Sequence, residues 1–207
     1  MIKIIDYGMG NCGSIKNMLR YLGAQFEVVD SPDKLFNAKA IILPGVGSFD
    51  NGMEHLKPFR SILELLVFED KVPFLGVCLG MQLLFKSSDE GDLPGLCWIE
   101  GQIKRFDFSG LDADERLVVP HMGWNEVRVT KENPLLQLKV VRDRFYFVHS
   151  YRVTNVNEED VLAVCHYGCD FTCAVQKENI FGVQFHPEKS HKFGKQLFQG
   201  FVELSKC

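Results

Sequence analysis

The sequence of 207 residues lacks several features that mark large classes of function. No apolar run approaches the roughly 20 residues that cross a bilayer, so we do not expect a membrane protein. No block of lysine or arginine is present and the net charge is −4, which argues against binding to nucleic acid or to an anionic membrane surface. Because internal repeats, low-complexity tracts and linkers are also missing, we expect a single domain over residues 1–207.

The seven cysteines form no CxxC pair, and an odd number fits poorly with a complete set of disulfides. The N-terminus shows no charged and then apolar signal segment. We therefore expect reduced thiols and a cytoplasmic location. Cys165, Cys169 and Cys173 are evenly spaced, but without a CxxC pair they give little support for zinc, and we expect neither a metal nor a cofactor.

What the chain does contain is a cysteine between two glycines at the end of an apolar run. Residues 72–77 show no polar alternation, as expected of a central parallel strand, and Cys78 follows them directly. Gly76 and Gly80 stand two positions to either side, which is the arrangement of a nucleophile elbow with cysteine in place of serine. A helix that begins near Leu79 would direct N–H groups at the sulfur and favour its thiolate. Taken alone, such a cysteine is more often a packing residue than a nucleophile.

The order of apolar segments predicts a parallel sheet covered by helices, followed by shorter, alternating strands after residue 95. Strands are expected at 1–6, 26–29, 40–43, 72–77, 145–148, 161–166, 171–176 and 180–185, and shorter alternating runs at 98–106 and 125–129. Helices are expected over 15–22, 53–68, 79–85 and 191–204. Residues 107–116 are polar and predict a loop.

Two loops of unusual composition are expected near the ends of strands. In residues 44–49, Pro-Gly-Val-Gly-Ser-Phe, two glycines would let backbone N–H groups face a ligand, although an ordinary glycine-rich turn explains them as well. Residues 120–125, Pro-His-Met-Gly-Trp-Asn, bring together residue types that would mark an interface if exposed. A loop packed on its own sheet is an equally good interpretation of this second segment.

A cysteine nucleophile needs a base and a group that orients the base. His186 is the best candidate for the base, because it comes just after the apolar strand at 180–185, as Cys78 follows its own strand. Strand ends of a parallel sheet share one edge, where open α/β sheets bind ligands. Glu188 lies two residues further on and could reach back to the imidazole. His149 also ends an apolar strand, but we expect a structural role for it.

Residues 76–82, Gly-Val-Cys-Leu-Gly-Met-Gln, together with Phe-His-Pro-Glu at 185–188 resemble the class I (triad) glutamine amidotransferases. The motifs at 6–11, 44–49, 120–125 and 147–151 are similar to those of the glutaminase subunits of imidazole glycerol phosphate synthases. The resemblance spans the whole chain. It implies a flavodoxin-like α/β fold, with a mostly parallel central sheet, helices on both faces and a small antiparallel addition, as a single amidotransferase domain.

The resemblance implies a role for individual residues. Cys78 would be the nucleophile, His186 the base and acid, and Glu188 the group that orients the histidine. Backbone N–H groups of Leu79, Val46 and Gly47 would hold the oxyanion. The residues that match the glutamine pocket of the family are Gly45, Gln82, Glu90, Ser150 and Tyr151. Glu90 would pair with the substrate ammonium, although a carboxylate in a polar loop is by default simply solvated.

The resemblance also implies a heterodimer. Glutamine would be hydrolysed to glutamate and ammonia through a cysteine thioester. The ammonia would pass to a (βα)8-barrel cyclase subunit that makes imidazole glycerol phosphate and AICAR in histidine biosynthesis. The residues that match the contact with this partner are Asn11, Pro120, His121, Met122, Gly123, Trp124 and Lys189.

Three alternatives stay open at this point. Residues 11–19 resemble relatives that feed ammonia to a synthase of surface-sugar amidation, and Cys97 stands where the family often has glycine. A free-standing cysteine hydrolase could use the same triad, but it would have no need for an exposed Met122 and Trp124. A flavodoxin-like binding module would explain the glycine turns but leave Cys78, His186 and Glu188 as a coincidence.

Overall fold

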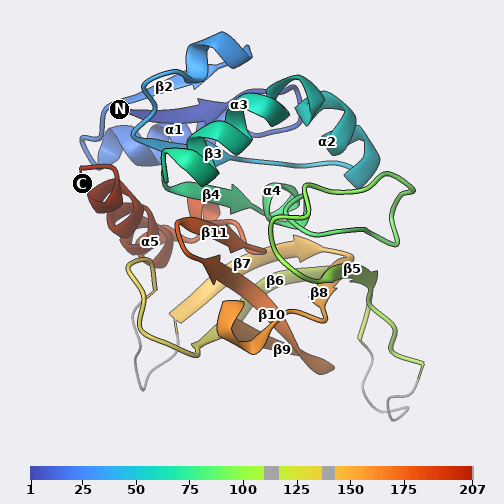
Figure 1. The fold of residues 1–207 in the computed structure, drawn as a ribbon. Coiled ribbons are helices and arrows are strands. Elements are labelled where there is room, and N and C mark those ends of the chain that lie inside the picture. Colours follow the sequence, from blue (N-terminus) through green and yellow to red (C-terminus); the bar gives the residue numbers. More distant parts are fainter. Residues whose placement is uncertain (110–116, 137–142, 207) are drawn as a thin grey trace.

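The computed structural model describes residues 1–109, 117–136 and 143–206, whose strands form one 11-stranded mixed sheet (Figure 1). The strands are β1 (Ile2–Ile5), β2 (Phe26–Val29), β3 (Ala40–Leu43), β4 (Phe74–Val77), β5 (Gln102–Arg105), β6 (His121–Val129), β7 (Asp143–His149), β8 (Tyr151–Thr154), β9 (Val161–Tyr167), β10 (Cys169–Lys177) and β11 (Ile180–Val183). The helices are α1 (Cys12–Tyr21), α2 (Phe49–Leu56), α3 (Arg60–Glu64), α4 (Leu79–Gln82) and α5 (His191–Leu204), with short 3-10 or π turns at η1 (Pro32–Leu35), η2 (Lys57–Phe59), η3 (Leu65–Glu69), η4 (Glu158–Asp160) and η5 (Pro187–Lys189).

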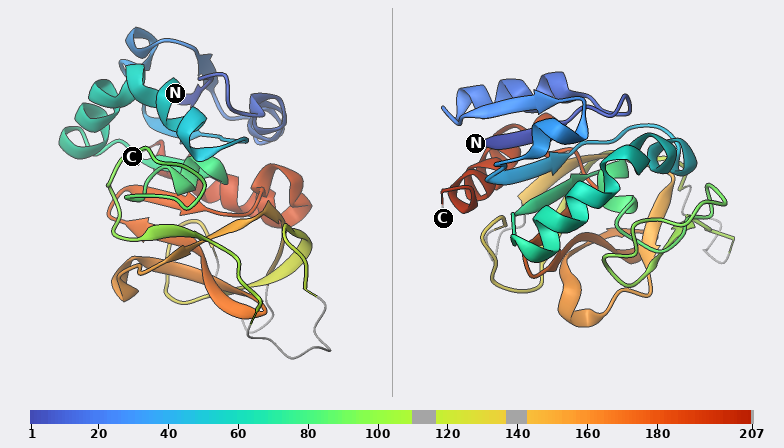
Figure 2. Two further views of the ribbon diagram at one scale, coloured as in Figure 1. Left: turned by 90° about the vertical axis from the view of Figure 1, so that its right-hand side faces the viewer. Right: turned by 45° about the horizontal axis from the view of Figure 1, so that its top comes forward.

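The sheet has a parallel half and an antiparallel half. Its main path runs β2-β1-β3-β4-β11-β10-β9-β6-β7, and the first five strands pair in parallel. The remaining strands pair antiparallel, and β8 joins β10 to β5. Figure 2 shows these later strands, coloured yellow to orange, lying to one side of the parallel strands. This arrangement confirms the predicted flavodoxin-like sheet with an antiparallel addition.

Alternate residues of the parallel strands point to opposite faces, and both faces are apolar because helices cover both. Ile4 and Ile42 pack with the apolar sides of α1 and α5 in one buried cluster. Ile5 and Ile41 pack with α2 and α3 in the other. This two-sided burial is the physical reason that the strand sequences show no polar alternation. Within the described ranges, no helix combines the length and apolar character needed to cross a membrane.

Two predicted helices are shorter than expected. The helix expected over 53–68 begins earlier, at Phe49, and is divided by η2, where Pro58 lacks the N–H group that a continuous helix needs. The helix after Cys78 ends at Gln82 instead of Phe85. Beyond it, the N–H groups of Leu96 and Trp98 bond to the carbonyls of Leu83 and Leu84 at 2.8 and 2.9 Å, so a tertiary contact takes the place of a further helical turn.

The loop expected at 120–125 is wrong, because His121 to Asn125 belong to β6. This strand pairs with β7 in the register His121 to His149 and Gly123 to Phe147. Pairing with a distant strand therefore outweighs the local loop signals of Pro120 and Gly123. Of the polar loop expected at 107–116, residues 110–116 lie outside the described residues.

Candidate active site

Cys78 stands between β4 and α4 in a backbone conformation that side chains rarely adopt, with φ 55° and ψ −111°. The two flanking glycines allow this turn because the backbone packs against itself there. A Cβ atom on Gly80 would overlap the carbonyl oxygen of Leu43, and one on Gly76 would overlap that of Gly80. The elbow predicted from the sequence is thus present, and its local strain is typical of functional sites.

The histidine and the glutamate of the predicted triad lie at the same edge of the sheet as Cys78. β11 pairs in parallel with β4, Val183 opposite Val77, so the chain beyond Val183 emerges beside the cysteine. Nδ1 of His186 and Oε1 of Glu188 are 2.8 Å apart, and each side chain is only 4% exposed. Nε2 of His186 is buried and has no hydrogen-bond partner among the described residues. It is therefore available for a proton from the thiol or from a substrate.

The surroundings of His186 favour its charged form. Burial alone would lower the pKa of this imidazole. Its interactions with the Cys78 sulfur and with the Glu188 carboxylate outweigh burial and raise the pKa above the usual range. His186 can therefore hold a proton while Cys78 carries a negative charge.

A cavity of about 310 Å³ opens over Cys78 and His186. Besides these two, it is lined by Val46, Gly47, Leu79, Gln82, Glu90, Val148, His149, Ser150, Tyr151 and Lys189. The volume lies within the range of small-molecule sites. The structure thus brings together the predicted substrate residues with one exception. Gly45 is not part of the lining and contributes its carbonyl below the cavity.

Glu90 is half-buried at this cavity and is not simply solvated. Its Oε2 accepts a hydrogen bond of 2.9 Å from the N–H of Phe49, and burial raises the pKa of its carboxyl group. Gln82 is buried beside Cys78, and Ser150 and Tyr151 approach from the junction of β7 and β8. Glu90 and Gln82 thus present a carboxylate and an amide on the side of the cavity formed by the elbow and the segment after it.

Two of the three expected oxyanion donors, Val46 and Leu79, are bonded to other backbone groups. The N–H of Val46 donates to the carbonyl of Met9 at 2.6 Å, and the N–H of Leu79 donates to the carbonyl of Gly45 at 3.3 Å. The peptide unit between Gly45 and Val46 takes part in both bonds, through its carbonyl and through its N–H. α4 contains four residues, and its first N–H, that of Leu79, is the one bonded to Gly45 and is therefore not free for the sulfur.

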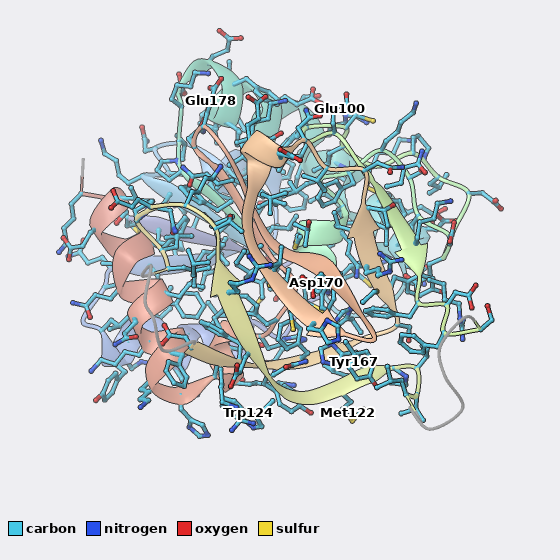
Figure 3. All side chains as sticks on the ribbon, turned by 90° about the horizontal axis from the view of Figure 1, so that it is seen from below. Glu100, Met122, Trp124, Tyr167, Asp170 and Glu178 are labelled. Carbon is cyan, nitrogen blue, oxygen red and sulfur yellow. The ribbon has the colours of Figure 1, made fainter. Side chains whose placement is uncertain are left out.

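Most of the residues predicted to contact a partner lie on the surface. Asn11, Pro120 and Lys189 are exposed, as are Met122 at 61% and Trp124 at 39%, while Gly123 is half-buried. Figure 3 shows Met122 and Trp124 projecting from the edge of the molecule along β6. The ring of Trp124 stacks on that of His191, with centroids 5.4 Å apart. His121 is different, because it is 3% exposed and points into the core.

His121 and His149 form a buried, uncharged pair behind the cavity. Nδ1 of His121 lies 2.9 Å from Nε2 of His149, and Nδ1 of His149 lies 2.7 Å from the carbonyl of Tyr151. That carbonyl requires a proton on Nδ1 of His149, so its Nε2 must accept the proton of His121. Burial lowers the pKa of His121 to about 4 and that of His149 to about 3. The structural role predicted for His149 agrees with this geometry.

One polar contact of the nucleophile did not follow from the motifs. Gln184 is 1% exposed, and its Nε2 lies 3.8 Å from Sγ of Cys78. Its Oε1 accepts a hydrogen bond of 2.9 Å from Nε2 of Gln82. The available signal was a single amide in an otherwise apolar stretch immediately before the histidine motif.

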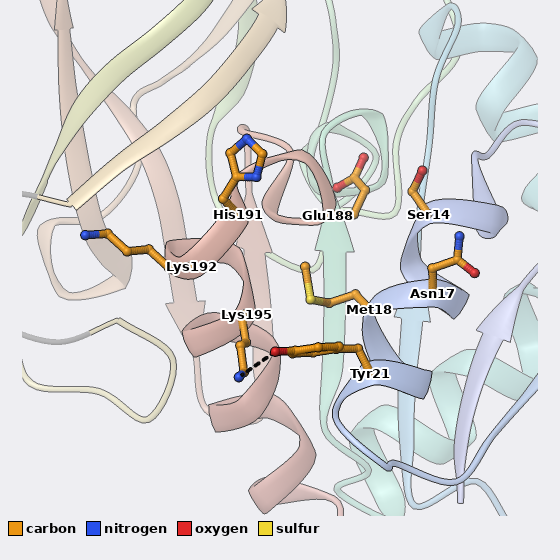
Figure 4. A pocket seen from close by; sticks show the side chains of 8 residues that line it. All are labelled: Ser14, Asn17, Met18, Tyr21, Glu188, His191, Lys192 and Lys195. Atoms are coloured by element: carbon orange, nitrogen blue, oxygen red, sulfur yellow. Dashed lines mark hydrogen bonds between the residues drawn. The ribbon is translucent and has the colours of Figure 1, made fainter.

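A larger cavity, of about 600 Å³, lies between α1 and α5 (Figure 4). It is lined by Ser14, Asn17, Met18, Tyr21, Glu188, His191, Lys192 and Lys195. Glu188 is shared with the site described above, but neither Cys78 nor His186 is part of this lining. The predicted nucleophile and base therefore open onto the smaller cavity.

Comparisons with known proteins agree with this geometry. The family model for glutamine amidotransferase class-I matches residues 3–204. The imidazole glycerol phosphate synthase subunit HisH of Leptospira borgpetersenii is 47% identical over 206 residues, which cover 99% of this chain and 100% of that protein. The subunit HisH 2 of Pseudomonas aeruginosa is 48% identical over 206 residues, with the same coverage.

Similar solved structures show the same fold. One is PurLQS from Thermotoga maritima, with a TM-score of 0.75 and 19% identity, covering 98% of this chain and 97% of that one. Another is a glutamine amidotransferase, with a TM-score of 0.74 and 20% identity, covering 100% and 99%. At these identities the solved structures show only that the fold is similar. The family model and the sequence relatives show the family. This chain belongs to the class I glutamine amidotransferases.

Proposed function

We propose that this chain is the glutaminase subunit of an imidazole glycerol phosphate synthase and supplies ammonia for histidine biosynthesis. The observation that carries the proposal is the buried pair His186–Glu188 at the same sheet edge as the strained Cys78 elbow, under a cavity that could hold an amino acid. The names of the sequence relatives with 47% and 48% identity support the pathway. The whole chain would act as one amidotransferase domain.

The reaction begins when Cys78 transfers its proton to Nε2 of His186 and its sulfur attacks the side-chain amide carbon of glutamine. His186 then gives the proton to the departing nitrogen, so ammonia leaves and a thioester remains. A water molecule, deprotonated by His186, attacks the thioester, and the proton returns to the sulfur as glutamate is released. Glu188 keeps the imidazole oriented and stabilises its charge throughout.

The rest of the cavity would bind the substrate at its ends. Glu90 carries a carboxylate for the ammonium group of glutamine, and Gln82, Ser150 and Tyr151 offer polar groups for its other atoms. Gly45 acts through its carbonyl, which bonds to Leu79 below the cavity. No metal ion or cofactor is required by this scheme.

A partner could control the reaction by changing the direction of the N–H groups that would hold the oxyanion. If the peptide unit between Gly45 and Val46 turned over, it would release both Val46 from Met9 and Leu79 from Gly45, and both N–H groups could face the oxyanion together with Gly47. Met9 stands two residues before exposed Asn11, where we place part of the partner contact. A (βα)8-barrel cyclase that docks there and on residues 120–124 would form a heterodimer, turn the loop and receive the ammonia directly.

The location of the reaction follows from the same proposal. The six described cysteines are unpaired, as expected in a reducing compartment. We therefore place the heterodimer in the cytoplasm.

The test is glutamine hydrolysis by the whole chain, measured alone and with an imidazole glycerol phosphate synthase barrel subunit that carries its nucleotide ligand. We expect weak hydrolysis alone and a stimulation of about 10²-fold or more in the complex, because one oxyanion donor is typically worth about 10²–10³ in rate. In the complex, Cys78→Ala should abolish synthesis from glutamine and leave synthesis from added ammonia intact.

Two results would contradict the proposal. Loss of the ammonia-dependent reaction in Cys78→Ala would mean that this residue holds the fold or the complex together. Glutamine hydrolysis without any response to the barrel subunit would keep the chemistry but refute the pathway, and would favour a synthase of surface-sugar amidation as the partner.

A further inference from the structure

The nucleophile of this chain has a side-chain neighbour outside the triad. Gln184 follows β11 directly and is the one amide between the apolar residues Val183 and Phe185. Its backbone N–H donates to the carbonyl of Cys173 at 2.8 Å, so its position is held from β10. Its side chain reaches across to the end of β4, with Nε2 3.8 Å from Sγ of Cys78.

The direction of this amide is set by Gln82. Nε2 of Gln82 carries only donor hydrogens, and it lies 2.9 Å from Oε1 of Gln184. In the structure the oxygen of Gln184 is occupied in this way, and its NH₂ group faces the sulfur. Both amides are buried, at 5% for Gln82 and 1% for Gln184, so bulk water does not compete for these bonds.

An amide N–H donor interacts differently with the neutral thiol and with the thiolate of Cys78. A neutral thiol is a weak acceptor, whereas a hydrogen bond to an ionised group is markedly stronger. A fixed N–H donor therefore favours the charged form of its acceptor over the neutral one. His186 supplies the positive partner on its own side of the sulfur, and Gln184 adds a neutral donor.

We propose that Gln184 is a positioning residue for the nucleophile, which directs the sulfur of Cys78 and stabilises its thiolate, while Gln82 keeps the amide of Gln184 in the donating direction. This inference rests on the proposed function in one respect, namely that Cys78 is the nucleophile. It also gives Gln82 a second role, because the same side chain lines the substrate cavity. Substrate contact at Gln82 and the charge state of Cys78 are thereby linked through Gln184.

The test uses the rate at which iodoacetamide alkylates Cys78 in the intact chain, followed by mass spectrometry of the labelled peptide from about pH 5 to 10. The pH at the midpoint of the rate profile reports thiolate formation, and the rate on the plateau at high pH reports the access of iodoacetamide to the sulfur. Gln184→Met keeps an unbranched side chain without a donor. Gln184→Glu keeps the shape but brings a negative charge. Gln176→Met is the matched control, because the side chain of Gln176 bonds to the carbonyl of Glu178, at 3.3 Å, and does not line the cavity.

We expect the midpoint of Cys78 to rise by about one pH unit in Gln184→Met, which makes alkylation about tenfold slower below both midpoints. Gln184→Glu should raise the midpoint further, since a carboxylate repels the thiolate. Gln176→Met should leave it in place. Melting temperatures of all variants are recorded, because a merely structural amide would lower the melting temperature without moving the midpoint.

Exposed Cys97 serves as the internal comparison. It separates the proposal that Cys78 is the nucleophile from the proposal that Gln184 stabilises the thiolate of Cys78. If Cys78 of the unchanged chain is alkylated with the same profile as Cys97, the proposed nucleophile fails, whatever Gln184 does. If Cys78 is activated but its midpoint in Gln184→Met is the same as in the unchanged chain, the role of Gln184 is overturned. Should Gln184→Met not fold, Gln184→Leu takes its place as the variant without a donor, because the charge of Gln184→Glu raises the midpoint whether or not Gln184 donates.

Discussion

At the scale of single residues, three buried histidines show how neighbours decide chemistry. His186, His149 and His121 are all at most 6% exposed. His186 has a carboxylate at 2.8 Å and a sulfur nearby, and its pKa is raised. His149 and His121 have each other and neutral carbonyl or amide groups, and burial lowers the pKa of both. Only the first of them is suited to take a proton near neutral pH.

We expect the pair His121–His149 to make the fold sensitive to acid. In the unfolded chain each histidine takes up a proton near pH 6.5, but in the folded chain uptake is delayed to about pH 4 for His121 and about pH 3 for His149. The unfolded state therefore binds more protons in this window, so the free energy of unfolding falls as the pH falls. The decrease amounts to at most about 1.4 kcal/mol per pH unit for each histidine. Above pH 6.5 their contribution is fully present.

Urea denaturation at about pH 7.5, 6 and 5 checks this expectation in the unchanged chain and in His149→Gln. The variant loses contacts, so it should be less stable at pH 7.5, and its disadvantage should shrink as the pH falls. His55→Gln is the control, because His55 is exposed and bonds to a neutral group, the carbonyl of Tyr7. A stability difference between His149→Gln and the unchanged chain that stays constant over this range would contradict the argument.

At the scale of elements, the elbow depends on close approach between three segments. β4, α4 and the end of β3 meet where Gly76 and Gly80 leave no room for a Cβ atom. The same crowding places Cys78 in its strained conformation and brings the Gly45 carbonyl to the N–H of Leu79. The geometry of the nucleophile is therefore a property of the packed elements and not of the short helix that follows it.

Gly80→Ala should destabilise the protein strongly. The added methyl group would meet the Leu43 carbonyl, and because backbone cannot move aside as a flexible side chain can, we expect the upper end of the usual cost of overpacking, about 3 kcal/mol in the free energy of unfolding. Chemical denaturation measures this. Gly13→Ala in α1 is the matched control: a Cβ atom there would meet Oδ1 of Asn11 at an ordinary contact distance of 3.4 Å, so we expect no loss and a gain of at most about 0.5–1 kcal/mol. A Gly80→Ala protein as stable as the unchanged chain would refute the packing argument.

At the scale of the whole molecule, neighbouring segments of the chain form both the substrate cavity and an exposed apolar surface. β6 carries Met122 and Trp124 outward, while the junction of β7 and β8 supplies Ser150 and Tyr151 to the cavity. Lys189 belongs to the cavity lining and is also exposed. A partner on this surface would therefore lie near the mouth of the cavity, as direct transfer of ammonia requires.

Trp124→Ala should weaken the complex with the barrel subunit and leave the fold intact. Buried aromatic anchors of interfaces typically contribute 2 kcal/mol or more, so we expect the dissociation constant to rise about 30-fold, measured by titration calorimetry, and the stimulation of glutamine hydrolysis to fall. Phe36→Ala is the matched control. Phe36 is 57% exposed, and it lies near Lys39, which bonds to Met1 at the opposite edge of the sheet. Equal affinity of both variants would remove Trp124 from the interface.

Much of the fold and of the candidate site could be predicted because local patterns carry that information. The apolar runs of β1 to β4 and β11 reflect burial on both faces, and glycines mark the elbow whatever the rest of the chain does. The prediction failed where distant partners override local signals. The sequence predicts a loop where residues 121–125 of β6 pair with β7, and it predicts a longer helix after Cys78 where bonds from Leu96 and Trp98 replace the last turn.

The sequence by itself determined the order of the strands and helices in the parallel half and the cysteine, histidine and glutamate at the ends of β4 and β11, since these follow from periodicity and motif spacing. Only the tertiary structure decided that Gln184 faces Cys78 across 106 positions of the chain and that His121 meets His149 across 28. It also decided that the N–H groups of Val46 and Leu79 bond to other backbone groups. The physical reason is that hydrogen-bond direction depends on which groups meet after folding, and no local pattern encodes that.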